Sequence, residues 1–186
     1  LFTFPGQGAQ KAGMLHALPP HAETERTLRE TSEVLGHDAL ELDSAAALAS
    51  TVAVQLCLLV AGVAMARVLA AHGAEPDMVA GLSIGAYPAA VTAGVLSYPD
   101  AVALVARRAR LMEQGYPRGY GMTAITGLDQ DQLEPLIARV HSAESPVYLA
   151  NLNAPRQLVV AGEEGALLRL GALALDAGAT RAERLA

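Results

Sequence analysis

The sequence has 186 residues, of which 52% are hydrophobic and 17% charged, and its net charge is −6. This composition is typical of a globular chain with a large core and excludes a disordered one. Because the negative charge is not offset by any basic run, nucleic acid is not expected as a partner. The single cysteine, Cys57, excludes a disulfide framework, and no His/Cys/Asp spacing predicts a metal site. We therefore expect a cytoplasmic protein without a metal.

The first part of the chain alternates strand and helix patterns. Residues 1–4 predict a strand, residues 23–36 a helix, and residues 51–72 a second helix. The uninterrupted apolar run of the second helix is shorter than the roughly 20 residues that a membrane span needs, so we expect a buried helix and no membrane association. Residues 76–81 then predict a buried strand that leads into Ser83.

The pattern continues with a short helix that ends near Ala93 and a longer one over residues 99–114. The longer helix has Ser97 as its expected N-cap and Gly115 at its end. Strands that alternate with helices predict a parallel sheet covered on both faces, which is the α/β class.

The pattern changes after residues 116–121. From there the order is strand, helix, strand, strand, helix, strand, which is that of a ferredoxin-like unit. We therefore expect one domain over residues 1–116 and a second over residues 117–186. The sequence does not begin with methionine and stops in an expected strand, so we expect a fragment.

The segment Gly81–Gly85 fits the pattern G-x-S-x-G, with Ser83 in the middle. In this pattern the serine lies on a strained strand-to-helix turn, where side chains on its neighbours would clash and the hydroxyl is exposed. The pattern alone is common. The apolar strand before it and the alanine-rich helix after it favour a nucleophile over a purely structural turn.

The loop over residues 4–10 places two glycines around Gln7 directly after a strand. Its backbone N–H groups are suited to complete an oxyanion hole with the N–H of Ile84. A glycine-rich loop is equally suited to cradle a phosphate or merely to turn the chain, although the P-loop pattern is absent.

Arg108 is expected within the apolar face of the helix over residues 99–114. The other members of that face are Ala101, Leu104, Val105, Leu111 and Met112. A guanidinium in such a place needs an anion, because an unpaired buried charge is costly. The ordinary interpretation is an ion pair with a buried carboxylate. The alternative is a substrate carboxylate bound through two parallel hydrogen bonds. By contrast, none of the five histidines lies in a pattern that indicates a catalytic base.

Four motifs in this order resemble the malonyl-CoA:acyl-carrier-protein transacylase family over essentially the whole chain: FPGQGAQ, GLSIGAYPAAVTAGVL, ARRARLMEQ and NLNAPRQLVVAG. The resemblance implies an α/β-hydrolase-like large subdomain with a parallel sheet and an inserted ferredoxin-like small subdomain. The remainder of the large subdomain is then expected beyond residue 186.

The resemblance also implies roles for single residues. Ser83 matches the nucleophile, and Arg108 matches the arginine that binds the malonyl carboxylate. Gln7 matches a substrate-binding glutamine whose backbone N–H forms the oxyanion hole with that of Ile84.

The chain departs from the family pattern beside the serine. Leu82 and Ala86 stand where the family usually has His and Glu, and this variant looks more like the epsilon subunit of malonate decarboxylase. The family's catalytic His follows the small subdomain, so we expect the base beyond residue 186. Asn151 and Asn153 match a turn of the small subdomain that lies near the cleft in the family.

The implied function is transfer of a malonyl group from malonyl-CoA, through a seryl ester, to the phosphopantetheine-type thiol of an acyl carrier protein. No bound cofactor is expected, and the expected partners are the carrier, the CoA thioester and malonate decarboxylase subunits. Fatty-acid or polyketide synthesis is the alternative pathway. A serine esterase or thioesterase, or a carrier-docking module without activity, remain the alternative functions.

Overall fold

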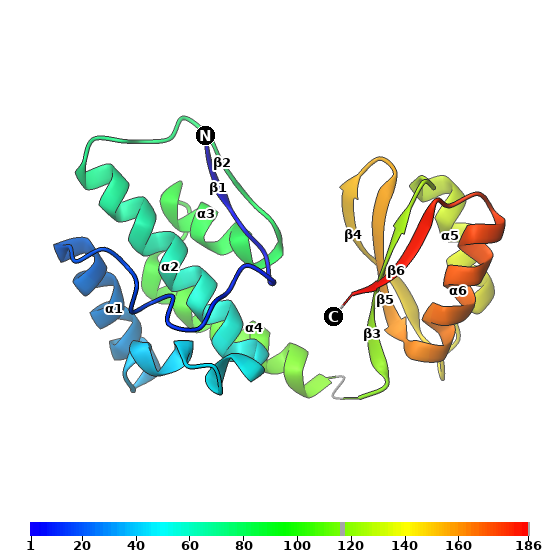
Figure 1. Ribbon diagram of the computed structural model, residues 1–186, viewed down its shortest axis with the longest axis horizontal. Coiled ribbons are helices and arrows are strands. Elements are labelled where there is room, and N and C mark those ends of the chain that lie inside the picture. Colours follow the sequence, from blue (N-terminus) through cyan, green and yellow to red (C-terminus); the bar gives the residue numbers. More distant parts are fainter. Residues whose placement is uncertain (116–117, 186) are drawn as a thin grey trace. The chain divides into compact units, whose positions relative to one another are not determined.

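The computed structural model describes residues 1–115 and 118–185 (Figure 1). The chain divides into two compact units, Leu1–Gly115 and the part that follows. The domain boundary expected between residues 116 and 117 lies outside the described residues.

The first unit combines a parallel strand pair with helices. Its elements in chain order are β1 (Phe2–Phe4), α1 (Ala22–Leu35), the 3-10 helices η1 (Ala39–Asp43) and η2 (Ala47–Ala49), α2 (Thr51–Ala71), β2 (Val79–Gly81), the 3-10 helix η3 (Ser83–Gly85), α3 (Ala86–Thr92) and α4 (Tyr98–Gly115). β1 and β2 pair in parallel, with Phe2 opposite Val79 and Phe4 opposite Gly81.

The strand before Ser83 is shorter and less buried than the sequence predicts. β2 begins only at Val79, and its residues are half-buried or exposed. Among the described residues β1 is its one partner strand, so the parallel sheet of the first unit has two strands within this part of the chain. The expectation of a buried strand over residues 76–81 is therefore wrong, whereas the expected parallel pairing is present.

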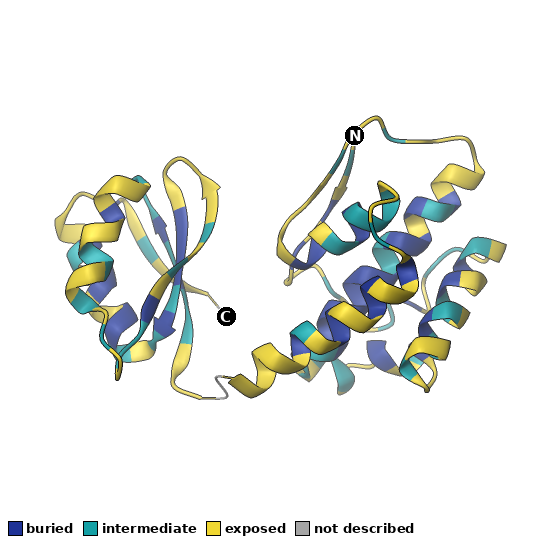
Figure 2. Ribbon diagram, turned by 180° about the vertical axis from the view of Figure 1, so that it is seen from behind, coloured by how far each residue is buried: buried dark blue, intermediate teal, exposed yellow. Residues whose placement is uncertain are grey.

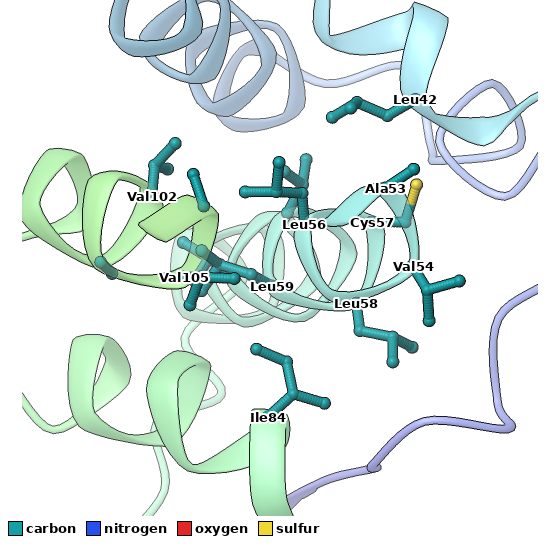
Figure 3. Close-up of a cluster of buried hydrophobic side chains, with 14 of the residues drawn as sticks. Leu42, Ala53, Val54, Leu56, Cys57, Leu58, Leu59, Ile84, Val102 and Val105 are labelled. Atoms are coloured by element: carbon teal, nitrogen blue, oxygen red, sulfur yellow. The ribbon is translucent and has the colours of Figure 1, made fainter. Parts of the chain in front are cut away.

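Helix α2 is the centre of the first unit. It packs against α1, α3 and α4, and its side chains form half of the buried core cluster, part of which is drawn in Figure 3. By length and composition α2 is able to cross a membrane, but 72% of its most apolar window is buried inside the unit. The predicted buried helix is confirmed. Figure 2 shows buried residues along α2 and on one side of α4.

The buried side of α4 is rotated from the side that the sequence predicts. Its buried residues are Tyr98, Ala101, Val102, Val105, Ala106 and Ala109. Leu104, Leu111 and Met112, expected on the buried face, are exposed. The expected face was only partly right, because Ala101 and Val105 are buried as expected but Val102, Ala106 and Ala109 take the place of the leucines and the methionine. Arg108 consequently lies at the edge of the buried face and is half-buried.

The second unit has the order strand, helix, strand, strand, helix, strand, as predicted. Its elements are β3 (Tyr120–Thr126), α5 (Gln130–Val140), β4 (Val147–Ala154), β5 (Gln157–Glu163), α6 (Glu164–Asp176) and β6 (Arg181–Leu185). The strands form one antiparallel sheet in the order β4-β5-β3-β6, and α5 and α6 pack on it. This is the ferredoxin-like arrangement.

Candidate active site

Ser83 lies on a strained turn between β2 and α3. Its φ of 52° makes it the one non-glycine residue with positive φ in the described part of the chain. Such a conformation costs about 1–3 kcal/mol and persists only where the surroundings enforce it. Here the turn carries the serine hydroxyl at the surface, because Ser83 is exposed while Ile84 and Gly85 are buried.

The two glycines of the motif are needed because backbone passes close to both. A Cβ on Gly81 would lie 2.0 Å from the carbonyl oxygen of Gly85. A Cβ on Gly85 would lie 2.2 Å from the carbonyl oxygen of Phe4. Any side chain at these positions would force the turn to open. The predicted steric need for glycine at both positions is therefore confirmed.

Ile84 anchors the turn to the core. Its side chain is fully buried and points from η3 toward Leu58 and Leu59 of α2 (Figure 3). Burying an isoleucine contributes about 1.5–3 kcal/mol, which is of the same size as the strain at Ser83. The apolar side chain thus fixes the position of the Ile84 backbone next to the nucleophile.

The loop after β1 runs beside this turn. The N–H of Leu82 donates to the carbonyl oxygen of Phe4 at 3.1 Å, and a Cβ on Gly6 would lie 3.1 Å from the carbonyl oxygen of Leu82. Within residues 1–115 and 118–185, the N–H of Gln7 donates to no protein acceptor. An oxyanion hole requires a free N–H of this kind close to the nucleophile, and the place of Gln7 in it stays a prediction.

Arg108 reaches the nucleophile from α4. Its Nη2 donates to Ser83 Oγ at 3.4 Å, which is a long hydrogen bond, and its Cζ lies 6.0 Å from the centre of the Tyr87 ring. None of the ion pairs formed by the described residues includes Arg108. The ordinary interpretation, an ion pair with a buried carboxylate, is therefore not what the structure shows. The charge is left available for an acidic ligand.

Sequence reasoning missed Gln55 as a site residue. Gln55 lies on α2 and is fully buried, and its Oε1 accepts a hydrogen bond from Arg108 Nη1 at 2.5 Å. Its Nε2 donates to Gln7 Oε1 at 3.3 Å and to Met112 Sδ at 3.5 Å. The available signal was a single amide in the otherwise apolar stretch of residues 52–66, since a buried amide needs polar partners.

No histidine of the described residues hydrogen-bonds to Ser83. His16 pairs with Asp43, His21 caps α1, and His141 contacts Val147. No described histidine is therefore close enough to Ser83 to act as the base that activates a serine nucleophile. Metal chemistry has no evident site either, because no group of three or more His, Cys, Asp or Glu is gathered among these residues.

Asn151 and Asn153 lie on β4 of the second unit, near two register shifts in its pairing with β5. Their expected place near a cleft stays a prediction.

The comparisons with known proteins agree with this geometry. The acyl transferase domain family matches residues 1–184. The chain belongs to this family. It is 41% identical to a malonyl CoA-acyl carrier protein transacylase of Escherichia coli O157:H7, over 97% of the chain and 60% of that protein. The chain thus spans about 60% of the length of such curated relatives.

Solved structures of relatives share the fold of this acyl transferase domain. An acyl carrier protein S-malonyltransferase from Vibrio cholerae matches with a TM-score of 0.86 at 39% identity, over 100% of this chain and 62% of that one. A malonyl-transacylase in complex with its type II PKS acyl-carrier protein matches with a TM-score of 0.85 at 39% identity, over 100% and 62% of the two chains. The predicted fold class and family are confirmed. The finer likeness to the malonate decarboxylase epsilon subunit stays a prediction.

Proposed function

We propose that this acyl transferase domain is part of an enzyme that moves a malonyl group from malonyl-CoA to the phosphopantetheine-type thiol of an acyl carrier protein. The observation that carries the proposal is the free charge of Arg108 at 3.4 Å from Ser83 Oγ. In a malonyl thioester one methylene separates the carboxylate from the carbonyl carbon that a nucleophile attacks. A guanidinium next to the nucleophile therefore fits this acyl group.

The proposed reaction has two halves. Ser83 Oγ attacks the thioester carbonyl, and its proton passes to a base that we expect to be a histidine outside the 186 residues. The oxyanion receives hydrogen bonds from the N–H groups of Gln7 and Ile84, each of which is typically worth about 3 kcal/mol of barrier. Expulsion of the CoA thiolate leaves a malonyl ester on Ser83. The carrier thiol then attacks this ester and releases the serine.

Arg108 gives the proposed enzyme its preference for an acidic acyl group. A malonyl carboxylate pairs with the guanidinium, whereas an acetyl group leaves the charge without a partner. Loss of one partner of a charge pair costs about 2–5 kcal/mol where the pair is fully buried, and a smaller part of this at the half-buried Arg108 still discriminates between the two acyl groups.

The pathway is a narrower proposal. We infer a role in malonate decarboxylase, supported by Leu82 and Ala86, which stand where the usual family motif has His and Glu. Leu82 is 55% exposed and lies against Gly6, so an apolar side chain and not an imidazole flanks the nucleophile. Fatty-acid or polyketide synthesis is the alternative, favoured by the names of the relatives. The proposed location is the cytoplasm, and the partners are the carrier and the decarboxylase subunits.

The test incubates the full-length protein and its Ser83→Ala variant with radiolabelled malonyl-CoA. We expect acid-stable label on the wild-type protein only, and transfer of that label to added carrier. Offering a malonate decarboxylase carrier subunit and a fatty-acid carrier side by side identifies the pathway. Label on Ser83→Ala would refute the nucleophile assignment. Release of free malonate without transfer to either carrier would indicate an esterase or thioesterase.

A further inference from the structure

Gln55 joins the two functional elements of the candidate site. It is the buried amide of α2 that contacts both Gln7, in the loop after β1, and Arg108, on α4. These contacts cross 48 and 53 residues of sequence. No other residue of the described chain forms side-chain hydrogen bonds with both. A substitution of Gln55 therefore removes contacts both to Gln7, in the loop expected to form the oxyanion hole, and to Arg108, which is expected to bind the substrate carboxylate.

The direction of the Gln55 amide is set by its partners. A guanidinium only donates, so the amide oxygen must face Arg108. The amide nitrogen then faces Gln7 Oε1 and Met112 Sδ, as found at 3.3 and 3.5 Å. Because the side chain is fully buried, water does not compete for these contacts. The amide is held at both ends and offers Arg108 a fixed acceptor.

A neutral acceptor has a specific advantage at this position. A carboxylate would hold the guanidinium equally well but would neutralise its charge, and the substrate carboxylate would then compete with it. The amide oxygen orients Arg108 through one N–H and leaves the positive charge and the remaining donors for a ligand. Gln55 therefore preorganises an arginine that is half-buried and otherwise free to adopt several rotamers.

We propose that Gln55 is a positioning residue that sets the preference for malonyl over uncharged acyl groups by orienting Arg108 without neutralising it. The proposal rests on the proposed malonyl transfer. It assigns to Gln55 no contact with the substrate. If Gln55 had a purely structural role, its loss would lower kcat/KM for every acyl group by a similar factor and leave the malonyl-to-acetyl ratio unchanged.

The experiment measures kcat/KM of the full-length protein for malonyl-CoA and acetyl-CoA, with formation of the acyl-enzyme as the readout. Gln55→Met removes both hydrogen bonds and keeps the length of the side chain. Gln55→Glu keeps its shape and adds a negative charge opposite Arg108. Cys57→Ala is the matched control, since Cys57 is a fully buried residue of the same helix that is no partner in the hydrogen bonds of Gln7, Arg108 and Ser83 described above. Arg108→Ala is the reference for loss of the clamp.

We expect Gln55→Met to lower the malonyl-to-acetyl ratio of kcat/KM by about tenfold or more, mainly through KM for malonyl-CoA. Gln55→Glu should lower the ratio as well, although it preserves the side-chain volume. Cys57→Ala should lower stability and leave the ratio unchanged. If Gln55→Met fails to fold, Gln55→Glu carries the same test.

Two results would overturn the inference in distinguishable ways. An unchanged ratio in the folded Gln55 variants, together with a lost preference in Arg108→Ala, would refute the role of Gln55 and leave the proposed function in place. No malonyl-enzyme from the wild-type protein would refute the proposed function, and the role of Gln55 with it.

Discussion

At the scale of single residues, the site depends on a serine whose backbone is strained and on the groups that enforce that strain. Gly81 and Gly85 allow the close approach of backbone, and Ile84 contributes buried surface of comparable free energy. The hydroxyl of Ser83 is thereby displayed at the surface within reach of Arg108. Each of these contributions can be removed separately.

The first prediction concerns Gly85→Ala. The added methyl group would meet the carbonyl oxygen of Phe4 at 2.2 Å, so β1 and the turn must separate. We expect the free energy of unfolding to fall by about 1–3 kcal/mol or more, measured by urea denaturation. Gly115→Ala is the matched control, because no atom lies within 4 Å of a Cβ at the end of α4. Equal stability of the two variants would contradict the close contact.

The second prediction concerns the charge and the shape of Arg108. Arg108→Lys keeps the charge but loses the planar pair of donors, whereas Arg108→Gln loses the charge. We expect the ratio of kcat/KM for malonyl-CoA to that for acetyl-CoA to fall in both variants of the full-length protein, and further in Arg108→Gln. A ratio that matches the wild type in Arg108→Gln would remove the carboxylate role. Arg107→Gln, an exposed change on the same helix, is the control.

At the scale of elements, local signals predicted the helices well. The features that depend on tertiary contacts, namely the buried side of α4 and the role of Gln55, were not predicted. Gly36 ends α1 with a left-handed φ of 77°, and Asp129 and Gln132 form a capping box at the start of α5. Both signals act within one turn of a helix. Which side of α4 is buried depends on how this helix packs against α2, and no local pattern contains that information. The role of Gln55 was missed for the same reason, since its partners are 48 and 53 residues away.

The third prediction concerns the segment between Gln7 and α1. Buried Asp43, at the end of η1, accepts hydrogen bonds from the N–H of Leu15 at 2.7 Å and from His16 Nδ1 at 2.9 Å. Burial raises the pKa of Asp43, but the hydrogen bonds from His16 and Leu15 outweigh it, and the net pKa is below its usual value. Asp43 therefore stabilises the fold above the pKa of an unfolded Asp, and this contribution is lost as the pH falls through the lowered folded value.

We expect Asp43→Asn to lower the free energy of unfolding at pH 7. The difference from the wild type should shrink as the pH is lowered below about 4, where the unfolded aspartate takes up a proton. Urea denaturation at several pH values measures both effects. Asp38→Asn is the control, because Asp38 is exposed and caps η1 with a single hydrogen bond to Leu40. A difference that grows toward acid pH would contradict the assignment.

At the scale of the whole molecule, each unit has a core of its own. The cluster around α2 contains only residues of the first unit, and a separate cluster contains only residues of the second. The second core is formed by Ile125, Leu133, Val160, Leu170 and their neighbours between the sheet and the two helices. The four strands β3 to β6 of the second unit also pair only with one another, in one sheet on which α5 and α6 pack.

The last prediction follows from this separation of cores. A chain of residues 118–186 should fold alone and unfold cooperatively with a stability of a few kcal/mol, about what a core of this size supplies. Leu170→Ala, at a fully buried position of α6, should lower the free energy of unfolding by about 2–5 kcal/mol and so unfold the isolated unit. Leu168→Ala, an exposed change on the same helix, should leave it folded. Circular dichroism and urea denaturation measure all three chains. If the isolated wild-type segment instead showed no cooperative transition, its stability would depend on contacts that its own core does not provide. In that case residues 118–186 would not be an independently folding unit.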